Sequence, residues 1–163
     1  MEVKRINKWL NSSELSDCLT KKNILDWLEE EGSITARISS HAEFKLEILN
    51  DDIGVAEDEE YIALEIPVEE VRIREVVLFG DLVPLVYARS IIPELTASKG
   101  YPGLGTIGSK PLGDLLFQSK LFIKTRREFA QFQTSSKEVV WGRRTHYFVR
   151  GYPLSVMEVF LLQ

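Results

Sequence analysis

The chain has 163 residues, of which 44% are hydrophobic and 28% are charged, and its formal net charge is −5. This composition suits one folded domain of a soluble cytoplasmic protein, and its acidic balance argues against a nucleic-acid partner. The single cysteine, Cys18, excludes an intrachain disulfide, no Cys/His cluster predicts a metal site, and no run reaches the ~20 apolar residues of a membrane-spanning helix.

The first part of the chain predicts a helix and several short segments. Thr20 can cap a helix through residues 21–31, whose apolar residues recur at helical spacing, and Gly32 can end it. A short turn or helix follows over residues 32–40. The pattern then predicts three segments: a strand over 44–49, an acidic loop over 50–60 and a short strand over 61–66.

The clearest strand signal is a hairpin. Residues 71–79 and 82–92 flank Gly80-Asp81, a two-residue connection of the kind that joins antiparallel strands. After the hairpin, the stretch 93–110 contains four glycines and two prolines. Long segments of this kind inside compact domains often serve as lids or binding loops.

Three long strand candidates close the chain, after a short helix predicted over residues 111–119. They cover residues 120–133, 138–150 and 154–162, and the links between them are short, so we expect antiparallel neighbours. The whole pattern predicts one α+β domain over residues 1–163, with a single six-stranded antiparallel sheet and helices packed on it.

Charge is unevenly distributed along the chain. Residues 26–60 hold twelve acidic and two basic residues, whereas residues 110–150 hold nine basic and three acidic residues. Two interpretations are open. Either these are solvated strand faces, or the basic segment forms a positive basin that attracts a small anion.

Two charged residues fall where a core is expected. Alternation in the last strand places Glu158 on a face that is otherwise apolar, and Arg74 lies where a face of the first hairpin strand changes from polar to apolar. Either they form a buried ion pair with each other, with Glu75 and Glu128 as further candidate partners of Arg74, or they line a ligand pocket. In a pocket, Arg74 would bind a carboxylate through its planar fork and Glu158 would bind a hydroxyl.

Four sequence blocks occur in a fixed order and spacing. They are DWLEEEGSITARI (26–38), REVVLFGDLVPLVYARSIIP (74–93), PLGDLLF (111–117) and WGRRTHYFVRGYPLSVMEVFL (141–161). Together they resemble the chorismate pyruvate-lyases of ubiquinone biosynthesis, over most of residues 26–161. The resemblance implies the family's six-stranded antiparallel sheet with helices, and an enzyme that eliminates pyruvate from chorismate to give 4-hydroxybenzoate.

The resemblance also implies site residues. Arg74 stands at the position of the family's arginine that grips the carboxylate of the aromatic product. Glu158 stands at the position of its glutamate that faces the product's hydroxyl. The backbone amides of Ile34 and Leu112 match positions that contact the same carboxylate. These four residues are therefore the expected catalytic and substrate-binding residues.

Two positions depart from the family pattern, and one assignment stays open. Ile34 replaces a methionine, which a backbone contact tolerates. Ala88 replaces a glycine, and its methyl group is expected to narrow the pocket. The second carboxylate of chorismate, on the enolpyruvyl group, is assigned to Arg89, Arg143 or Arg144 without a choice among them.

We expect no metal and no redox cofactor, a monomer, and chorismate, 4-hydroxybenzoate and pyruvate as small-molecule partners. The segments 32–35 and 107–114 match flaps that cover the ligand in this family. Two rival interpretations remain. One is a non-catalytic sensor or carrier of aromatic carboxylates with the same fold, although the roughly twenty residues before the first block are too few for the DNA-binding domain of repressors that carry such sensors. The other is a structural interaction protein.

Overall fold

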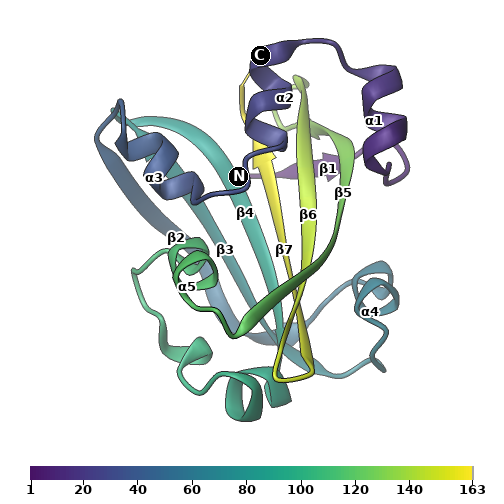
Figure 1. The fold of residues 1–163 in the computed structure, drawn as a ribbon, viewed down its shortest axis with the longest axis vertical. Helices are drawn as coiled ribbons and strands as arrows, with labels where there is room; N and C mark the ends of the chain where they lie inside the picture. The colour runs from purple at the N-terminus through teal and green to yellow at the C-terminus, as the bar shows by residue number, and fades with distance from the viewer. Residues whose placement is uncertain (163) are drawn as a thin grey trace.

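The structure is a computed structural model that describes residues 1–162, in which one antiparallel sheet is packed with five α-helices (Figure 1). The seven strands follow the order β1-β5-β6-β7-β4-β3-β2. They are β1 (Val3–Arg5), β2 (Phe44–Val55), β3 (Glu70–Gly80), β4 (Val83–Pro93), β5 (Phe122–Thr134), β6 (Val139–Val149) and β7 (Tyr152–Phe160). The helices are α1 (Ser12–Cys18), α2 (Lys22–Leu28), α3 (Ile34–Ser39), α4 (Asp58–Leu64) and α5 (Leu112–Gln118), with a π-helical turn η1 (Thr96–Gly100) and a 3-10 turn η2 (Leu104–Thr106). No helix within this range is both long enough and apolar enough to span a membrane.

The expected α+β fold is confirmed, with seven strands in place of six. The additional strand, β1, pairs with the edge of β5, where Val3 lies opposite Thr134. Its three residues are too few for a period-2 pattern to be recognised in the sequence. The first predicted helix is α2, and its N-cap is Lys21 rather than Thr20.

The acidic segment after residues 44–49 was expected to be a loop, and this prediction was wrong. β2 continues to Val55, and its register places Asp51 opposite Arg74 of β3. Asp51 pairs with Arg72 and with Arg74, at 3.0 Å in each case. Because cross-strand pairs of opposite charge stabilise a sheet, acidic residues suit a strand that lies beside a basic neighbour.

The strand expected over residues 61–66 is also wrong, because most of this segment belongs to α4. Glu57 and Glu60 form a reciprocal capping box at the start of the helix, which satisfies backbone N–H groups that would otherwise lack partners. Tyr61 and Leu64, one turn apart, are both buried against the sheet. A short apolar pattern of this kind fits a strand as well as a helix, and the capping residues decide between them.

The predicted β3–β4 hairpin is confirmed, with its turn shifted by one residue. Asp81 and Leu82 form the connection, with φ angles of 50° and 65°. Left-handed backbone at both positions is the signature of a type I′ turn, whose twist matches that of the strands it joins. Arg150 and Gly151 connect β6 and β7 in the same way, with φ angles of 50° and 84°.

Helices cover both faces of the sheet. We call the front face the one that carries Arg74, Val156 and Glu158; α2 and α3 pack on its upper half and α5 lies over its lower half (Figure 1). The opposite, back face packs against α4 through Ile73 and Ile91. The strands therefore have two buried faces, and charged side chains on either face need partners.

Candidate active site

The front face carries a band of polar side chains between two apolar clusters. Above the band, Leu28 and Ile38 of the helices pack with Phe160; below it, Leu112 of α5 packs with Leu154. Cross-strand register aligns two rows of residues within the band. From β3 to β5, one row is Arg74, Ser90, Val156, Thr145 and Arg127, and the other is Val76, Ala88, Glu158, Arg143 and Phe129.

Glu158 is matched by Arg143, its direct neighbour on β6. Nε of Arg143 donates to Oε1 of Glu158 at 2.9 Å, and the two side chains are 3% and 14% exposed. Nη1 of Arg143 also donates to the carbonyl oxygens of Leu28, at 3.0 Å, and Glu30, at 2.8 Å. The second carboxylate oxygen, Oε2, accepts no hydrogen bond within residues 1–162. Glu158 therefore keeps an acceptor for a ligand while its charge is compensated.

Arg74 is buried as well, with 2% of its side chain exposed, and its partner is Asp51. Nη1 of Arg74 donates to Oδ2 of Asp51 at 3.0 Å. The partners considered from the sequence are all engaged elsewhere. Glu158 pairs with Arg143, and Glu75 and Glu128 belong to ion pairs on the back face. The arginine thus has a structural ion pair, but this pair occupies only part of its guanidinium.

The guanidinium of Arg74 also anchors the predicted flap over residues 107–114. Nη1 donates to the carbonyl oxygen of Gly108 at 2.8 Å, and Nη2 donates to that of Lys110 at 2.7 Å. A guanidinium has five N–H donors, and three of them are used within the described part of the chain. Two donors, one of them Nε–H, remain for a ligand.

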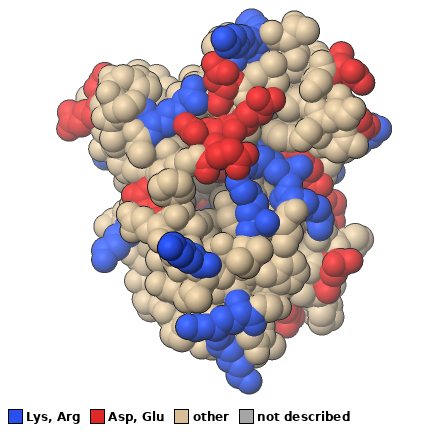
Figure 2. Space-filling view, in the orientation of Figure 1, with Lys and Arg blue, Asp and Glu red and all other residues tan. Residues whose placement is uncertain are grey.

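A cavity of about 240 Å³ opens in front of Glu158, between the 31–34 turn, α5 and strands β5 to β7. On the face shown in Figure 2, acidic and basic side chains border a hollow in this part of the molecule. Of the four predicted site residues, Ile34 and Glu158 line the cavity, whereas Arg74 and Leu112 do not. Sheet spacing places the Cα atoms of Arg74 and Glu158 roughly 12 Å apart, since they are two strands and one two-residue step from each other.

Ile34 and Leu112 both begin helices. Ile34 is the first residue of α3, and Leu112 is the first residue of α5. The backbone N–H groups of first helical residues have no acceptor within their own helix. The two backbone N–H groups expected to bind the ligand therefore lack helical acceptors and can donate to a ligand oxygen.

The two predicted flaps are joined to each other. Oγ of Ser33 donates to Oδ1 of Asp114 at 2.7 Å, which links the turn before α3 to the first turn of α5. The same Oγ accepts the backbone N–H of Ala36 at 3.1 Å and so caps α3. Asp114 and Ser33 lie in the segments 107–114 and 32–35, so the two segments expected to be flaps are in contact beside the same cavity.

The sequence offered a positive basin within residues 110–150 as one of two interpretations, but it did not show which cations gather around this cavity. Four cationic and two anionic side chains line it: Lys120, Lys124, Arg127, Arg143, Glu31 and Glu158. Alternation within residues 120–133 places Arg127 on the face of Phe129, and this was the signal that could have found it. Tyr147 also lines the cavity, and burial, followed by the charge of Glu158, raises the pKa of its phenol, so this hydroxyl remains a donor.

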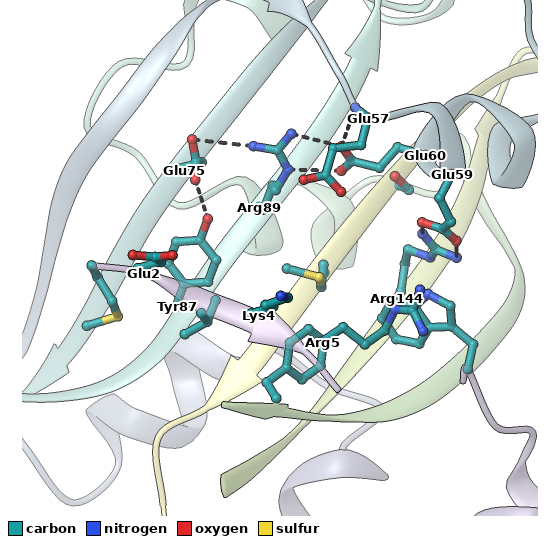
Figure 3. A pocket seen from close by; sticks show the side chains of 16 residues that line it. Glu2, Lys4, Arg5, Glu57, Glu59, Glu60, Glu75, Tyr87, Arg89 and Arg144 are labelled. Carbon is teal, nitrogen blue, oxygen red and sulfur yellow. Dashed lines mark hydrogen bonds and ion pairs between the residues drawn. The ribbon is translucent and has the colours of Figure 1, made fainter. Parts of the chain in front are cut away.

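The back face carries a larger cavity of about 410 Å³, in which several charged side chains pair with one another (Figure 3). Arg89 donates two hydrogen bonds to Glu60, at 2.9 Å and 2.8 Å, and these bonds raise the pKa of its guanidinium. Oε1 of Glu75 lies 3.4 Å from Nη1 of Arg89, and Oε2 of Glu75 accepts a hydrogen bond from the hydroxyl of Tyr87. This network joins α4 to the sheet.

Arg144 is committed to the same back face. It donates two hydrogen bonds to Glu59, at 2.8 Å and 2.7 Å, and its guanidinium lies 4.3 Å from the centre of the Trp9 ring. Of the three arginines considered for the second carboxylate of chorismate, Arg89 and Arg144 therefore point away from the site. Only Arg143 lies on the front face.

The fold and this site define a class of α+β domains that hold a cation-lined cavity against one face of an antiparallel sheet. The sequence matches the family model described as Chorismate lyase over residues 4–163. A probable chorismate pyruvate-lyase 2 of Pseudomonas entomophila is 36% identical over 162 residues, covering 94% of this chain and 87% of the relative. A chorismate pyruvate-lyase of Pectobacterium carotovorum is 32% identical over 145 residues, covering 86% and 77%. The chain belongs to the chorismate lyase family.

Solved structures with the same fold come from transcriptional regulators. PhnF of Mycobacterium smegmatis aligns with a TM-score of 0.61 and 15% identity, covering 81% of this chain and 64% of that chain. The ligand-binding domain of a putative GntR-family regulator of Bordetella bronchiseptica aligns with a TM-score of 0.56 and 18% identity, covering 83% and 88%. At these identities the likeness shows the fold alone.

Proposed function

We propose that this chain is a chorismate pyruvate-lyase, which eliminates pyruvate from chorismate and leaves 4-hydroxybenzoate for ubiquinone biosynthesis. The observation that carries the proposal is the placement of Arg74 and Glu158 on one buried sheet face, each with hydrogen-bonding capacity left over. The ring carboxylate and the ring hydroxyl of chorismate lie at opposite ends of its ring. A guanidinium and a carboxylate on one face complement these two ends.

Each predicted residue has a role in binding. Arg74 binds the ring carboxylate through its two remaining N–H donors, and the N–H groups of Ile34 and Leu112 approach the same carboxylate when the flaps close. Glu158 accepts a hydrogen bond from the ring hydroxyl through Oε2. The apolar clusters above and below the band exclude water, which strengthens each of these interactions.

The reaction is an elimination. The C3–O bond breaks, and its electron pair leaves with the ether oxygen, which becomes the keto oxygen of pyruvate. C4 loses its hydrogen as a proton, and the electrons of that bond complete the aromatic ring. One proton adds to the methylene carbon of the leaving group and forms the methyl group of pyruvate. Atoms and electrons balance without an oxidant or a reductant, so we propose a reaction without a redox cofactor.

The protein contributes orientation and charge. Holding a reactant in one geometry can lower a barrier by roughly 7–11 kcal/mol. The cationic side chains on the front face stabilise the negative charge that develops on the leaving oxygen, and we propose that they do this without a metal. Every group named here comes from one chain, so we propose that the monomer is active.

The test is turnover in the presence of a chelator. Purified protein with chorismate and EDTA is expected to release 4-hydroxybenzoate and pyruvate in equal amounts. Arg74→Ala is expected to abolish this turnover, whereas Arg72→Ala, which removes the neighbouring charge that also pairs with Asp51, is expected to retain it. Undiminished turnover by Arg74→Ala would remove this residue from the site.

The second candidate function is a non-catalytic sensor or carrier of an aromatic carboxylate. The fold likeness to a regulator's ligand-binding domain favours it. In that case chorismate is consumed no faster than it is without protein, while 4-hydroxybenzoate still binds and Arg74→Ala weakens the binding. The two functions are thus distinguished by whether the protein accelerates the release of pyruvate from chorismate.

A further inference from the structure

Arg127 is the arginine of the front face that lacks a committed carboxylate. Arg74 is paired with Asp51, and Arg143 is paired with Glu158, in both cases at about 3 Å. Within residues 1–162, the only ion-pair partner of Arg127 is Glu31, at 3.4 Å, and 74% of the Glu31 side chain is exposed. The charge of Glu158 also acts on Arg127 from within the same cavity, but Glu158 is paired with Arg143.

The ion-pair partner of Arg127 is shared with another cation. Glu31 also pairs with Lys124. The other contacts of Arg127 are neutral: Nε donates to Oγ1 of Thr145 at 2.9 Å, and Nη1 donates to the carbonyl oxygen of Glu30 at 3.2 Å. These contacts hold the side chain in place without neutralising it.

Burial and the positive charge of the nearby Arg143 both disfavour the protonated, charged form of the Arg127 guanidinium. The side chain is 11% exposed, and its burial, followed by the charge of Arg143, lowers the pKa of its guanidinium. Both arginines donate to the same carbonyl oxygen, that of Glu30. An anion that enters the cavity therefore gains more from Arg127 than from Arg143, which already has its own carboxylate.

The position of Arg127 fits the second charged group of chorismate. Arg127 and Glu158 line the same cavity, in adjacent rows of the front face. The enolpyruvyl ether of chorismate is attached to C3, beside the C4 carbon that carries the hydroxyl. If the hydroxyl is at Glu158 and the ring carboxylate is toward Arg74, the enolpyruvyl group extends into this cavity.

We propose that Arg127 binds the carboxylate of the enolpyruvyl group of chorismate. This inference rests on the proposed function and adds to it the residue that recognises the leaving group. The product 4-hydroxybenzoate has no second carboxylate, so Arg127 distinguishes substrate from aromatic product. The same guanidinium holds pyruvate after the C3–O bond has broken.

The test compares the substrate with the aromatic product. Arg127→Gln is expected to lower kcat/KM for chorismate by roughly 10- to 100-fold, the effect of losing a hydrogen bond between charged groups. Its Kd for 4-hydroxybenzoate is expected to stay within about 2-fold of the wild-type value, because no contact with that ligand is lost. Arg127→Lys keeps the charge but loses the planar fork, and an intermediate kcat/KM is expected.

The matched control is Arg126→Gln. Arg126 is the adjacent arginine on β5, it points to the other side of the strand, and it donates to the carbonyl oxygen of Ala63. This variant removes the same charge and is expected to leave kcat/KM unchanged. Added pyruvate is expected to compete with chorismate in the wild type and to lose this effect in Arg127→Gln.

Three results would overturn the inference. One is an unchanged kcat/KM for chorismate in Arg127→Gln. Another is an equal loss of affinity for chorismate and for 4-hydroxybenzoate, which would make Arg127 a structural residue. The third, which does not depend on folding of the glutamine variant, is full activity of Arg127→Lys. Absence of turnover by the wild-type protein would instead contradict the proposed lyase function itself.

Discussion

Arg143 and Glu158 lie directly opposite each other on β6 and β7, and each is the other's ion-pair partner beneath the loop that follows α2. The pair occupies the centre of a face that is apolar above and below. A buried ion pair of this kind contributes little net stability, but the loss of one partner leaves an uncompensated buried charge. The pair therefore compensates the charge of Glu158 and leaves Oε2 without a partner within residues 1–162, as the proposed contact with the ring hydroxyl requires.

Arg143→Met is expected to lower the free energy of unfolding by about 3–5 kcal/mol, because Glu158 is then buried without a partner. The double variant Arg143→Met/Glu158→Leu is expected to recover at least half of this loss, since both charges are then absent. Urea unfolding of the two variants measures the difference. A double variant that is no more stable than the single variant would show that Arg143 acts through its carbonyl contacts alone.

Gly142→Ala is expected to destabilise the sheet and to displace Glu158. A Cβ atom at this position would lie 2.7 Å from the ring of Phe132 and 2.9 Å from the backbone oxygen of Glu158, so the strands must separate. Overpacking of this kind costs about 1–3 kcal/mol. The variant is expected to lose kcat as well, measured with chorismate.

The control for this prediction is Gly54→Ala in edge strand β2. A Cβ atom there would meet only the side chain of Ile73, at an ordinary 3.5 Å. Little change in stability or activity is expected. Equal effects of the two substitutions would indicate a general cost of replacing strand glycines.

Asp114→Ala is expected to speed the release of 4-hydroxybenzoate. The hydrogen bond from Ser33 to Asp114 joins the two flaps, and its loss lowers the cost of opening them. The dissociation rate of the product, measured by stopped flow, is expected to rise by up to about 10-fold. Asp26→Ala, an exposed aspartate of α2, is the control and is expected to leave this rate unchanged. A slower release from Asp114→Ala would contradict the flap interpretation.

Acid is expected to weaken the fold through Glu128. Burial alone would raise the pKa of this carboxyl, but the hydrogen bond to His146 and the charge of Arg144 outweigh it and hold the pKa at about 2, against an ordinary 4.5. Because the folded pKa is depressed, the contribution of Glu128 is complete above about pH 4.5 and is lost as the pH falls toward 2. The contribution amounts to about 3 kcal/mol.

Urea unfolding at several pH values checks this prediction. As the pH falls, Glu128→Gln is expected to lose less of its free energy of unfolding than the wild type loses. Glu138→Gln, at an exposed position before β6, is expected to behave as the wild type. Identical pH profiles for Glu128→Gln and the wild type would show that other carboxylates govern the acid sensitivity.

The sequence by itself determined most of the sheet and two of its charged residues. Local strand patterns identified six of the seven strands, β2 only over its first half, and the short connections predicted antiparallel neighbours. Alternation within a single strand also placed Arg74 and Glu158 on faces that pass into the core. These features are local, since each depends on residues within one strand or one turn.

Only the tertiary structure decided which charges meet. The ion pairs of Arg74 with Asp51 and of Arg143 with Glu158 depend on strand order and register, and a one-residue slip would send every side chain of a strand to the other face. Strand order also brought Arg127 to the cavity from β5. Capping by Glu57, rather than the apolar pattern, made residues 58–64 a helix. The alternation within a strand determines which of its side chains lie on one face of the sheet. The pairing of strands far apart in the chain determines which side chains from different strands lie next to each other on that face.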